Sequence, residues 1–160
     1  MWNADLERLA VFAHSRLDAT VDASTLNSPA ELERYGETLA RDLPFGTVLI
    51  LSGPMGAGKT TLTKGIARGL EFSGEVTSPT YTYIHQYPTP HGELVHIDAY
   101  RLEDARSLWR MGLEELLETA RLTVIEWGEA LIPDFERVTV LRLTILESGR
   151  EISLEASPSE

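Results

Sequence analysis

The feature that most constrains this chain is a glycine-rich segment at residues 53–60, which reads Gly53-Pro54-Met55-Gly56-Ala57-Gly58-Lys59-Thr60. An apolar run at 47–51 precedes it and reads as a buried strand, and apolar residues at helical spacing follow it over 61–67. A strand, a glycine loop and a helix in this order are the context in which the pattern G-x-x-x-x-G-K-T binds phosphate. We therefore predict a phosphate-binding loop, with a chance glycine turn as the alternative.

The physical chemistry of such a loop predicts its ligands. Glycines let the backbone curl so that consecutive N–H groups point at phosphate oxygens, and the following helix adds its positive N-terminal end. We expect Lys59 to reach the β- and γ-phosphates of a nucleotide and the Thr60 hydroxyl to ligate Mg²⁺. A nucleotide and Mg²⁺ are thus the predicted cofactors.

The length of 160 residues is enough for one domain with its own core. We assign this domain to residues 21–156, after an N-terminal extension at 1–20 and before a frayed tail at 157–160. The sequence contains no apolar run of membrane-spanning length, no signal-peptide pattern and no cysteine, so we expect a cytoplasmic protein. A net charge of −11 disfavours strong binding to nucleic acid by bulk electrostatics.

Apolar periodicity and turn signals predict an α/β fold, and the resemblance of residues 53–60 to the loop of phosphate-loop NTPases implies the three-layer sandwich of those proteins. Its central sheet is expected to be mostly parallel, with antiparallel late strands. Strands are expected near 21–27 (at an edge), 47–51, 76–86, 94–98, 121–127, 137–146 and 151–156. Helices are expected at 28–43, after the glycine loop and at 103–120, and a turn is expected at 88–92.

Two predicted strands end in carboxylates, Asp98 and Glu126. Because parallel α/β sheets carry their ligand groups at the carboxyl ends of strands, both side chains are candidates for the same site. We expect Asp98 to hold Mg²⁺, and Glu126 to ligate Mg²⁺ or to orient an attacking water. A helix cap or an ordinary loop carboxylate is the alternative for Asp98, and a surface carboxylate is the alternative for Glu126.

A hydroxyl-rich segment, Ser78-Pro79-Thr80-Tyr81-Thr82, follows the predicted phosphate-loop helix. In this position it is similar to a switch that senses the γ-phosphate, although Ser-Pro-Thr also occurs in ordinary turns. Further along the chain stand His96-Ile97-Asp98-Ala99-Tyr100-Arg101-Leu102, Met111-Gly112-Leu113-Glu114-Glu115 and Glu126-Trp127. In this order, these motifs and the loop Gly53 to Thr61 resemble the bacterial TsaE (YjeE) family of small phosphate-loop ATPases over about residues 22–155.

The resemblance implies roles for individual residues. It places Lys59, Thr80, Asp98, Glu126 and Trp127 in catalysis, and Thr60, Asp98 and Glu126 on the metal. The nucleotide-binding residues that it implies are Gly53, Gly56, Ala57, Gly58, Lys59, Thr60, Thr61 and Arg150. His96 and Tyr100 are expected to hold the surrounding loop. Pro54 departs from the family, which usually has aspartate there, and Arg106-Ser107-Leu108 replaces an acidic helix start.

The resemblance also implies a function. Members are required to form N6-threonylcarbamoyladenosine in tRNAs that read ANN codons, with slow ATP hydrolysis that resets a complex with TsaB-like and TsaD-like proteins. TsaD performs the transfer, so tRNA contact is expected to be indirect, and the chain alone is expected to be a monomer. A small nucleoside or nucleotide kinase and a nucleotide-sensing adaptor remain as alternatives. A guanine switch is disfavoured because no N-K-x-D segment is present.

Overall fold

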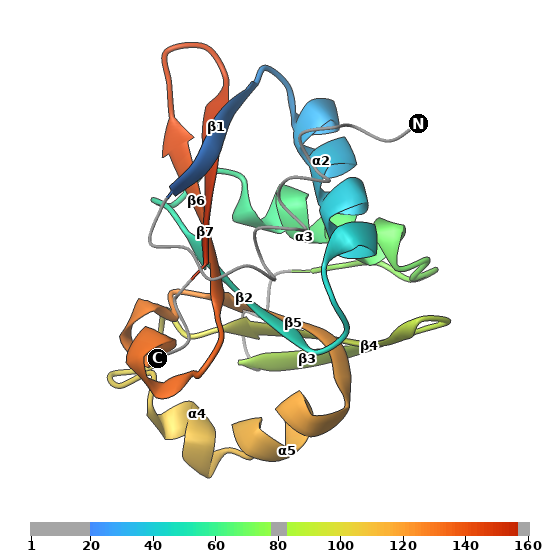
Figure 1. The fold of residues 1–160 in the computed structure, drawn as a ribbon, viewed down its shortest axis with the longest axis vertical. Helices are drawn as coiled ribbons and strands as arrows, with labels where there is room; N and C mark the ends of the chain where they lie inside the picture. Colours follow the sequence, from blue (N-terminus) through green and yellow to red (C-terminus); the bar gives the residue numbers. More distant parts are fainter. Residues whose placement is uncertain (1–19, 78–82, 157–160) are drawn as a thin grey trace.

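The computed structural model describes residues 20–77 and 83–156, and within them seven strands form one sheet (Figure 1). The strand order is β1-β7-β6-β2-β5-β4-β3. The strands are β1 (Thr20–Leu26), β2 (Thr47–Ser52), β3 (Ile84–Thr89), β4 (Gly92–Asp98), β5 (Ala120–Glu126), β6 (Thr139–Ile145) and β7 (Arg150–Ala156). Neighbours among β6, β2, β5 and β4 are parallel, whereas β7 and the two edge strands pair antiparallel. The predicted α/β class is confirmed, with a mixed sheet.

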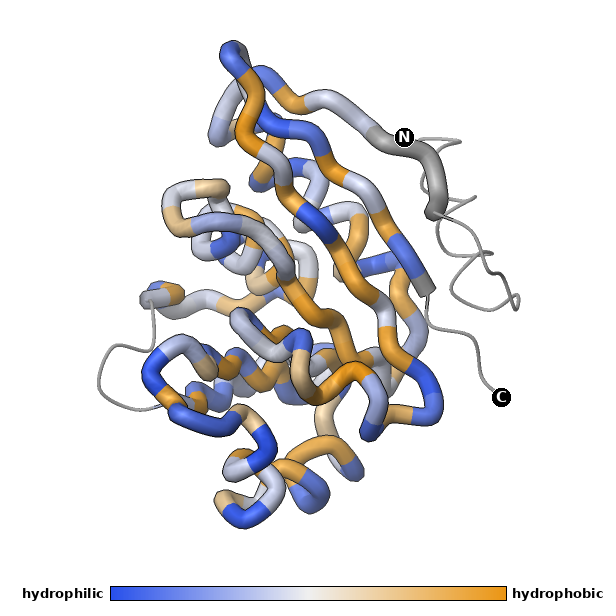
Figure 2. Tube along the Cα trace, turned by 90° about the vertical axis from the view of Figure 1, so that its left-hand side faces the viewer, coloured by the Kyte–Doolittle hydropathy of each residue, from blue (hydrophilic) through white to orange (hydrophobic). Residues whose placement is uncertain are grey.

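Helices cover both faces of this sheet (Figure 1). They are α2 (Pro29–Asp42) and α3 (Lys59–Gly69) on one face, and α4 (Ser107–Arg110) and α5 (Leu113–Thr119) on the other, with a 3-10 helix η1 (Glu129–Asp134). Alternation along β2 explains the layers, because Leu49 and Leu51 belong to the core under α2 and α3 while Ile50 belongs to the core under α4 and α5. Orange and blue also alternate along strands in Figure 2. Among the described helices, none is long and apolar enough to cross a membrane.

Helix α2 starts as the sequence predicts. The Ser28 hydroxyl accepts the N–H of Glu31 at 3.2 Å, Pro29 occupies the first turn, and Glu31 Oε2 accepts the N–H of Asn27 at 2.6 Å. The first bond satisfies a backbone donor of the first helical turn, and the second fixes the residue just before the Ser28 cap. Close packing then fixes α2 on α3, because a Cβ on Gly65 would collide with the carbonyl of Glu33. The helix behind the glycine loop is therefore held firmly.

Several predicted boundaries are wrong. The helix expected at 103–120 divides at Gly112, whose φ of 97° ends the helical path between α4 and α5. The strand expected from 76 begins only at Ile84, and the segment 78–82 lies outside the described residues, as do 1–19 and 157–160. The turn expected at 88–92 narrows to 90–91, because β3 continues through Pro88. Proline is tolerated there because β3 is an edge strand.

The N-terminal boundary also shifts slightly. Strand β1 begins at Thr20, the last residue assigned to the extension, and it is the edge strand that was expected. Its antiparallel partner β7 is the last strand of the described chain. Pairing between these two distant segments joins the first strand to the sheet that carries the glycine loop.

Candidate functional site

The glycine loop joins the end of β2 to the start of α3, as predicted. Gly56 and Gly58 have φ values of 81° and 109°, which L side chains rarely adopt. A Cβ at Gly56 would meet nothing within 4 Å, so the loop is open on that side, whereas a Cβ at Gly58 would strike Leu32 of α2. The predicted strand, loop and helix are therefore present, and the loop is more than an isolated turn.

Lys59 begins α3 and is 6% exposed. Its Nζ donates to the carbonyl of Gly53 at 2.8 Å and lies 3.8 Å from the centroid of the Trp127 ring. Burial lowers the pKa of Lys59 below its ordinary value, and three carboxylates act in the opposite direction, namely Glu126, Glu129 and Asp98. None of the described carboxylates forms an ion pair with this amine, so its charge is available to an anionic ligand.

Asp98 and Glu126 lie directly opposite each other at the carboxyl ends of the parallel strands β4 and β5. Asp98 Oδ1 accepts the N–H of Tyr100 at 2.9 Å, which closes a turn after β4. Because no described helix begins at this point, the helix-cap alternative for Asp98 is wrong, whereas the turn contact agrees with the loop-carboxylate alternative, and its role on a metal stays a prediction. Glu126 is 4% exposed, so the surface-carboxylate alternative is wrong as well.

Glu126 has a partner that the sequence reasoning missed. His96 is fully buried, and its Nε2 lies 2.7 Å from Glu126 Oε2. His96 was expected to hold a loop, but its side chain instead reaches across from β4 to β5. Strand alternation could have indicated this, because His96 and Asp98 are two residues apart and share one face of β4.

Trp127 follows Glu126 directly and leaves the strand with a φ of 59°. Its ring packs against Tyr100, with centroids 5.1 Å apart, and against the Lys59 amine. Tyr100 is 54% exposed. These contacts place an aromatic pair beside the phosphate-loop lysine, with one ring reaching the surface.

Arg150 contacts the glycine loop from the start of β7. Its guanidinium donates to the carbonyls of Ala57 at 3.0 Å and Gly56 at 3.3 Å, and to its own neighbour Gly149 at 2.8 Å. In the structure it therefore braces the loop backbone. Its approach to a nucleotide stays a prediction.

A cavity of about 330 Å³ opens beside the glycine loop. Leu26, Pro29 and Leu32 supply its apolar wall. Its polar side is formed by the loop, Thr61 and Arg150. It therefore offers apolar contact next to backbone N–H groups, as small-molecule sites usually do.

The predicted metal ligands are one hydroxyl, that of Thr60, and two carboxylates, those of Asp98 and Glu126. Within the described residues, no group of three or more His, Cys, Asp and Glu side chains could hold a metal ion alone. Mg²⁺ in a phosphate loop needs fewer ligands from the protein, because one hydroxyl and one or two carboxylates complete its coordination together with phosphate oxygens and waters. Thr60 lies in the first turn of α3, and Asp98 and Glu126 end the neighbouring strands β4 and β5, so these three residues are of the right chemical type, and their binding of Mg²⁺ stays a prediction. Thr80 lies outside the described residues.

Comparisons with known proteins agree with this geometry. Residues 26–152 match the family model described as threonylcarbamoyl adenosine biosynthesis protein TsaE. The chain therefore belongs to the TsaE family. A TsaE from Treponema pallidum is 37% identical over 79% of this chain and 95% of its own length. TsaE from Bacillus subtilis is 36% identical over 81% of this chain and 82% of its own length.

A solved structure supports the same assignment. The crystal structure of YdiB from Bacillus subtilis superposes with a TM-score of 0.70 at 26% identity. The match covers 90% of this chain and 89% of that chain. The TsaE family takes part in the biosynthesis of threonylcarbamoyladenosine in tRNA, so the predicted family and pathway are confirmed.

Proposed function

We propose that this protein binds ATP with Mg²⁺ and hydrolyses the ATP slowly, as one component of the complex that forms N6-threonylcarbamoyladenosine in tRNAs reading ANN codons. The observation that carries the proposal is the position of Lys59 between the glycine loop and the carboxylates Asp98 and Glu126. That arrangement supplies charge for the phosphates and acceptors for a reacting water at one end of the sheet.

Each residue has a defined task in this proposal. The N–H groups of the loop residues, from Gly53 to Thr61, hold the β-phosphate, and the Lys59 amine exchanges its contact with the Gly53 carbonyl for phosphate oxygens. Thr60 and Asp98 hold Mg²⁺, which neutralises charge on the β- and γ-phosphates. Glu126 orients the attacking water, Thr80 acts as the switch-like threonine that the family resemblance implies, and Trp127 contributes to activity beside Lys59.

The cavity beside the loop is our proposed position for the base and ribose of the nucleotide. Its apolar wall, formed by Leu26, Pro29 and Leu32, suits the faces of a purine ring. The brace from Arg150 to the Ala57 carbonyl keeps the loop fixed between the base and the phosphates.

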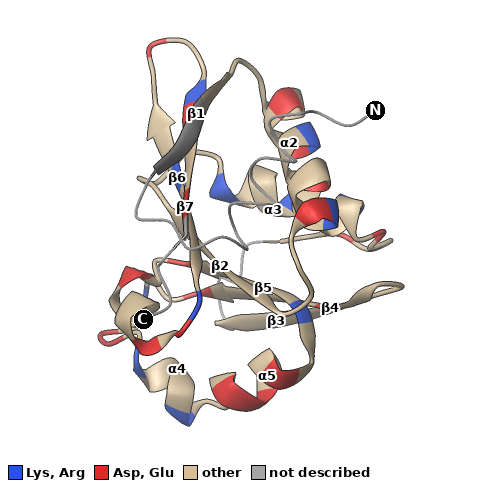
Figure 3. Ribbon diagram, in the orientation of Figure 1, with Lys and Arg blue, Asp and Glu red and all other residues tan. Residues whose placement is uncertain are grey.

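The chain alone should turn over slowly, because the described residues offer no obvious arginine finger; Arg150, which contacts the loop, donates to the carbonyls of Gly56 and Ala57. Partners of the TsaB and TsaD type would raise the rate by holding the Trp127 region over the nucleotide, or the segment 78–82, which lies outside the described residues; transfer to tRNA is left to the TsaD-like protein. A gain of about a hundredfold needs roughly 2.7 kcal/mol of transition-state stabilisation, which one well-placed donor can supply. The acidic surface, evident on α5 (Figure 3), favours protein partners over direct tRNA contact.

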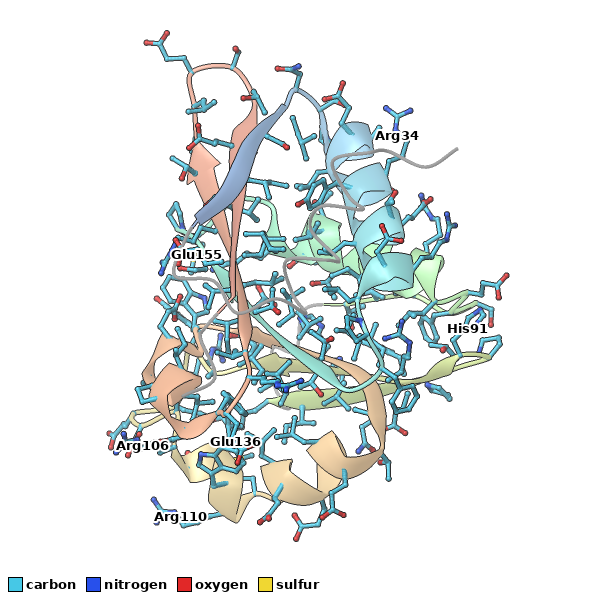
Figure 4. The ribbon with its side chains drawn as sticks, viewed as in Figure 1. Arg34, His91, Arg106, Arg110, Glu136 and Glu155 are labelled. Atoms are coloured by element: carbon cyan, nitrogen blue, oxygen red, sulfur yellow. The ribbon has the colours of Figure 1, made fainter. Side chains whose placement is uncertain are left out.

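A nucleotide kinase is the weaker alternative. Such enzymes need a lid with several arginines, and three of the four arginines between Asp98 and Glu126 lie away from the site. Arg121 donates to the carbonyls of Ala40 and Leu43, and Arg106 pairs with Asp134 at 3.7 Å. Arg106 and Arg110 project outwards from the α4 region, on the far side of the sheet from α3 (Figure 4).

Steady-state phosphate release, measured with and without a TsaB–TsaD-type complex, tests the proposal together with a tRNA modification assay. We expect slow release by the chain alone, faster release with the complex, and modification over many cycles only when the chain is present. If the complex neither binds the chain nor changes its turnover, the proposed function is wrong. Transfer of phosphate to an added nucleoside or nucleotide would instead support the kinase.

A further inference from the structure

We propose that His96 is a positioning residue for Glu126: its Nε2–H holds Oε2 of the carboxylate and so leaves Oε1 to face the reacting water or Mg²⁺. This inference rests on the proposed hydrolysis of ATP at this site. It is carried by one buried hydrogen bond of 2.7 Å between His96 on β4 and Glu126 on the neighbouring strand β5.

The sheet sets the geometry of this pair. Asp98 stands directly opposite Glu126, and His96 stands opposite Val124, so the imidazole reaches diagonally along the shared face. Val124 belongs to the core under α2 and α3, so this face is the one that the glycine-loop helix covers. His96, Asp98 and Glu126 therefore present their side chains towards the same end of α3, where Lys59 lies.

Burial makes the bond necessary. The His96 side chain is fully buried and the Glu126 side chain is 6% exposed, and a carboxylate removed from water is costly unless a donor satisfies it. Among the described residues, His96 Nε2 is the donor that reaches this carboxylate. Lys59 acts on Glu126 electrostatically, without an ion pair within 4.0 Å.

The second ring nitrogen identifies the tautomer. His96 Nδ1 is buried and has no hydrogen-bond partner in the described part of the chain. A proton on Nδ1 would be a buried donor without an acceptor, whereas a bare Nδ1 leaves only a lone pair unmatched. The neutral ring with its proton on Nε2 is therefore the form that fits, and it donates in one fixed direction.

Without this bond, Glu126 would lose its orientation. The terminal torsion of a glutamate side chain is broad, so a carboxylate held at neither oxygen turns easily. The carboxylate would then be attracted to the Lys59 amine, because Glu126 is the carboxylate that raises the pKa of Lys59 most. His96 thus keeps the carboxylate available for water and keeps the lysine available for phosphate.

Three variants test the direction of the bond. The amide nitrogen of His96→Gln can stand near the Nε2 position, that of His96→Asn stands near the Nδ1 position, and His96→Leu has no donor. We expect kcat for ATP hydrolysis to fall about 10- to 100-fold in His96→Leu and His96→Asn, as for other residues that orient ligating carboxylates. His96→Gln should keep most of the rate, and in His96→Asn and His96→Leu kcat should fall by a larger factor than KM for ATP rises, because the loop N–H groups still hold the phosphates.

The control is His91→Gln, since His91 is 51% exposed at the β3–β4 turn, away from the site (Figure 4). Melting curves of all variants identify any that fail to fold. If His96→Gln and His96→Asn lose equal activity while folded, or if folded His96→Leu keeps the full rate, the inference is overturned. Either of these results would leave the proposed function intact if the wild-type protein hydrolyses ATP and Glu126→Gln lowers that rate.

A measurement on the nucleotide-free protein needs no activity at all. Nitrogen-15 NMR of the imidazole rings should show His96 protonated on Nε2 and bare on Nδ1, and the His96→Leu spectrum assigns the signal. In Glu126→Gln the Nε2–H signal should shift, because its charged acceptor becomes a neutral amide. A proton on Nδ1 alone would overturn the inference even if ATP hydrolysis is confirmed. An Nε2–H chemical shift that is the same in the wild type and in Glu126→Gln would overturn it as well.

Discussion

The amine of Lys59 lies 3.8 Å from the centroid of the Trp127 ring, so the phosphate-loop lysine rests on an aromatic face in this structure. A cation over an indole gains about 0.5–2 kcal/mol, more as the pair is removed from water. The same amine also donates to Gly53 at 2.8 Å. A nucleotide phosphate must therefore draw Lys59 away from contacts within the protein, and Trp127 is placed to report that exchange.

Tryptophan fluorescence tests this exchange. With Trp2 and Trp109 replaced by phenylalanine, the emission of Trp127 should change when ATP and Mg²⁺ are added, because the cation leaves the ring. In the same background, Lys59→Met should change the starting emission and abolish most of the response. Equal responses with and without Lys59 would show that the lysine does not move on binding.

Lys59→Ala should abolish hydrolysis and weaken ATP binding. Loss of a charged hydrogen bond costs about 1.5–3 kcal/mol, which corresponds to roughly 10- to 150-fold in affinity. Titration calorimetry measures the affinity, and Lys64→Ala, at an exposed position of the same helix, is the matched control. Unchanged affinity together with unchanged turnover in Lys59→Ala would contradict the phosphate-loop assignment.

Asp98→Asn and Glu126→Gln should each suppress hydrolysis far more than ADP binding. Both carboxylates act on Mg²⁺ or the reacting water, while the loop N–H groups retain the β-phosphate, so we expect a fall in kcat of about 10²- to 10⁴-fold for Glu126→Gln. Single-turnover phosphate release and ADP titration separate the two effects. Wild-type turnover in either variant, measured with the partner complex, would remove that residue from the site.

Arg150→Ala should weaken nucleotide binding by loosening the loop. The guanidinium holds the carbonyls of Ala57 and Gly56, and each charged hydrogen bond contributes about 1.5–3 kcal/mol when fully formed. Arg68→Ala is the control, because Arg68 is exposed and pairs with Glu33 and Glu37 at the far end of α3. A loss of ADP affinity in Arg150→Ala but not in Arg68→Ala supports the brace, and equal affinities in both would refute it.

Gly65→Ala should destabilise the fold even though alanine is the better helix former. The gain in helix propensity is about 1 kcal/mol, but a Cβ there would collide with the Glu33 carbonyl and lie 2.8 Å from Glu33 Cα, and overpacking typically costs about 1–3 kcal/mol. Urea unfolding measures the balance. A more stable Gly65→Ala would show that α2 can move away from α3.

Local chemistry in the sequence determined much of this protein. The loop at 53–60, the serine cap of α2 and the carboxylates Asp98 and Glu126 at strand ends were all predictable, because each depends on residues close together in the chain. The division of the helix at Gly112 was missed, because a glycine in a helical pattern can be tolerated or can end the helix. The packing around the glycine determines which of the two occurs.

Tertiary structure decided the contacts that complete the site. His96 meets Glu126 from 30 residues away, Trp127 covers Lys59 through a turn with φ of 59°, and Arg150 reaches the glycine loop across more than 90 residues. Periodicity shows which side chains share a face, but strand order and register determine which of them touch. The β4–β5 register, in which Asp98 stands opposite Glu126, is what brings the His96 imidazole to one oxygen of Glu126.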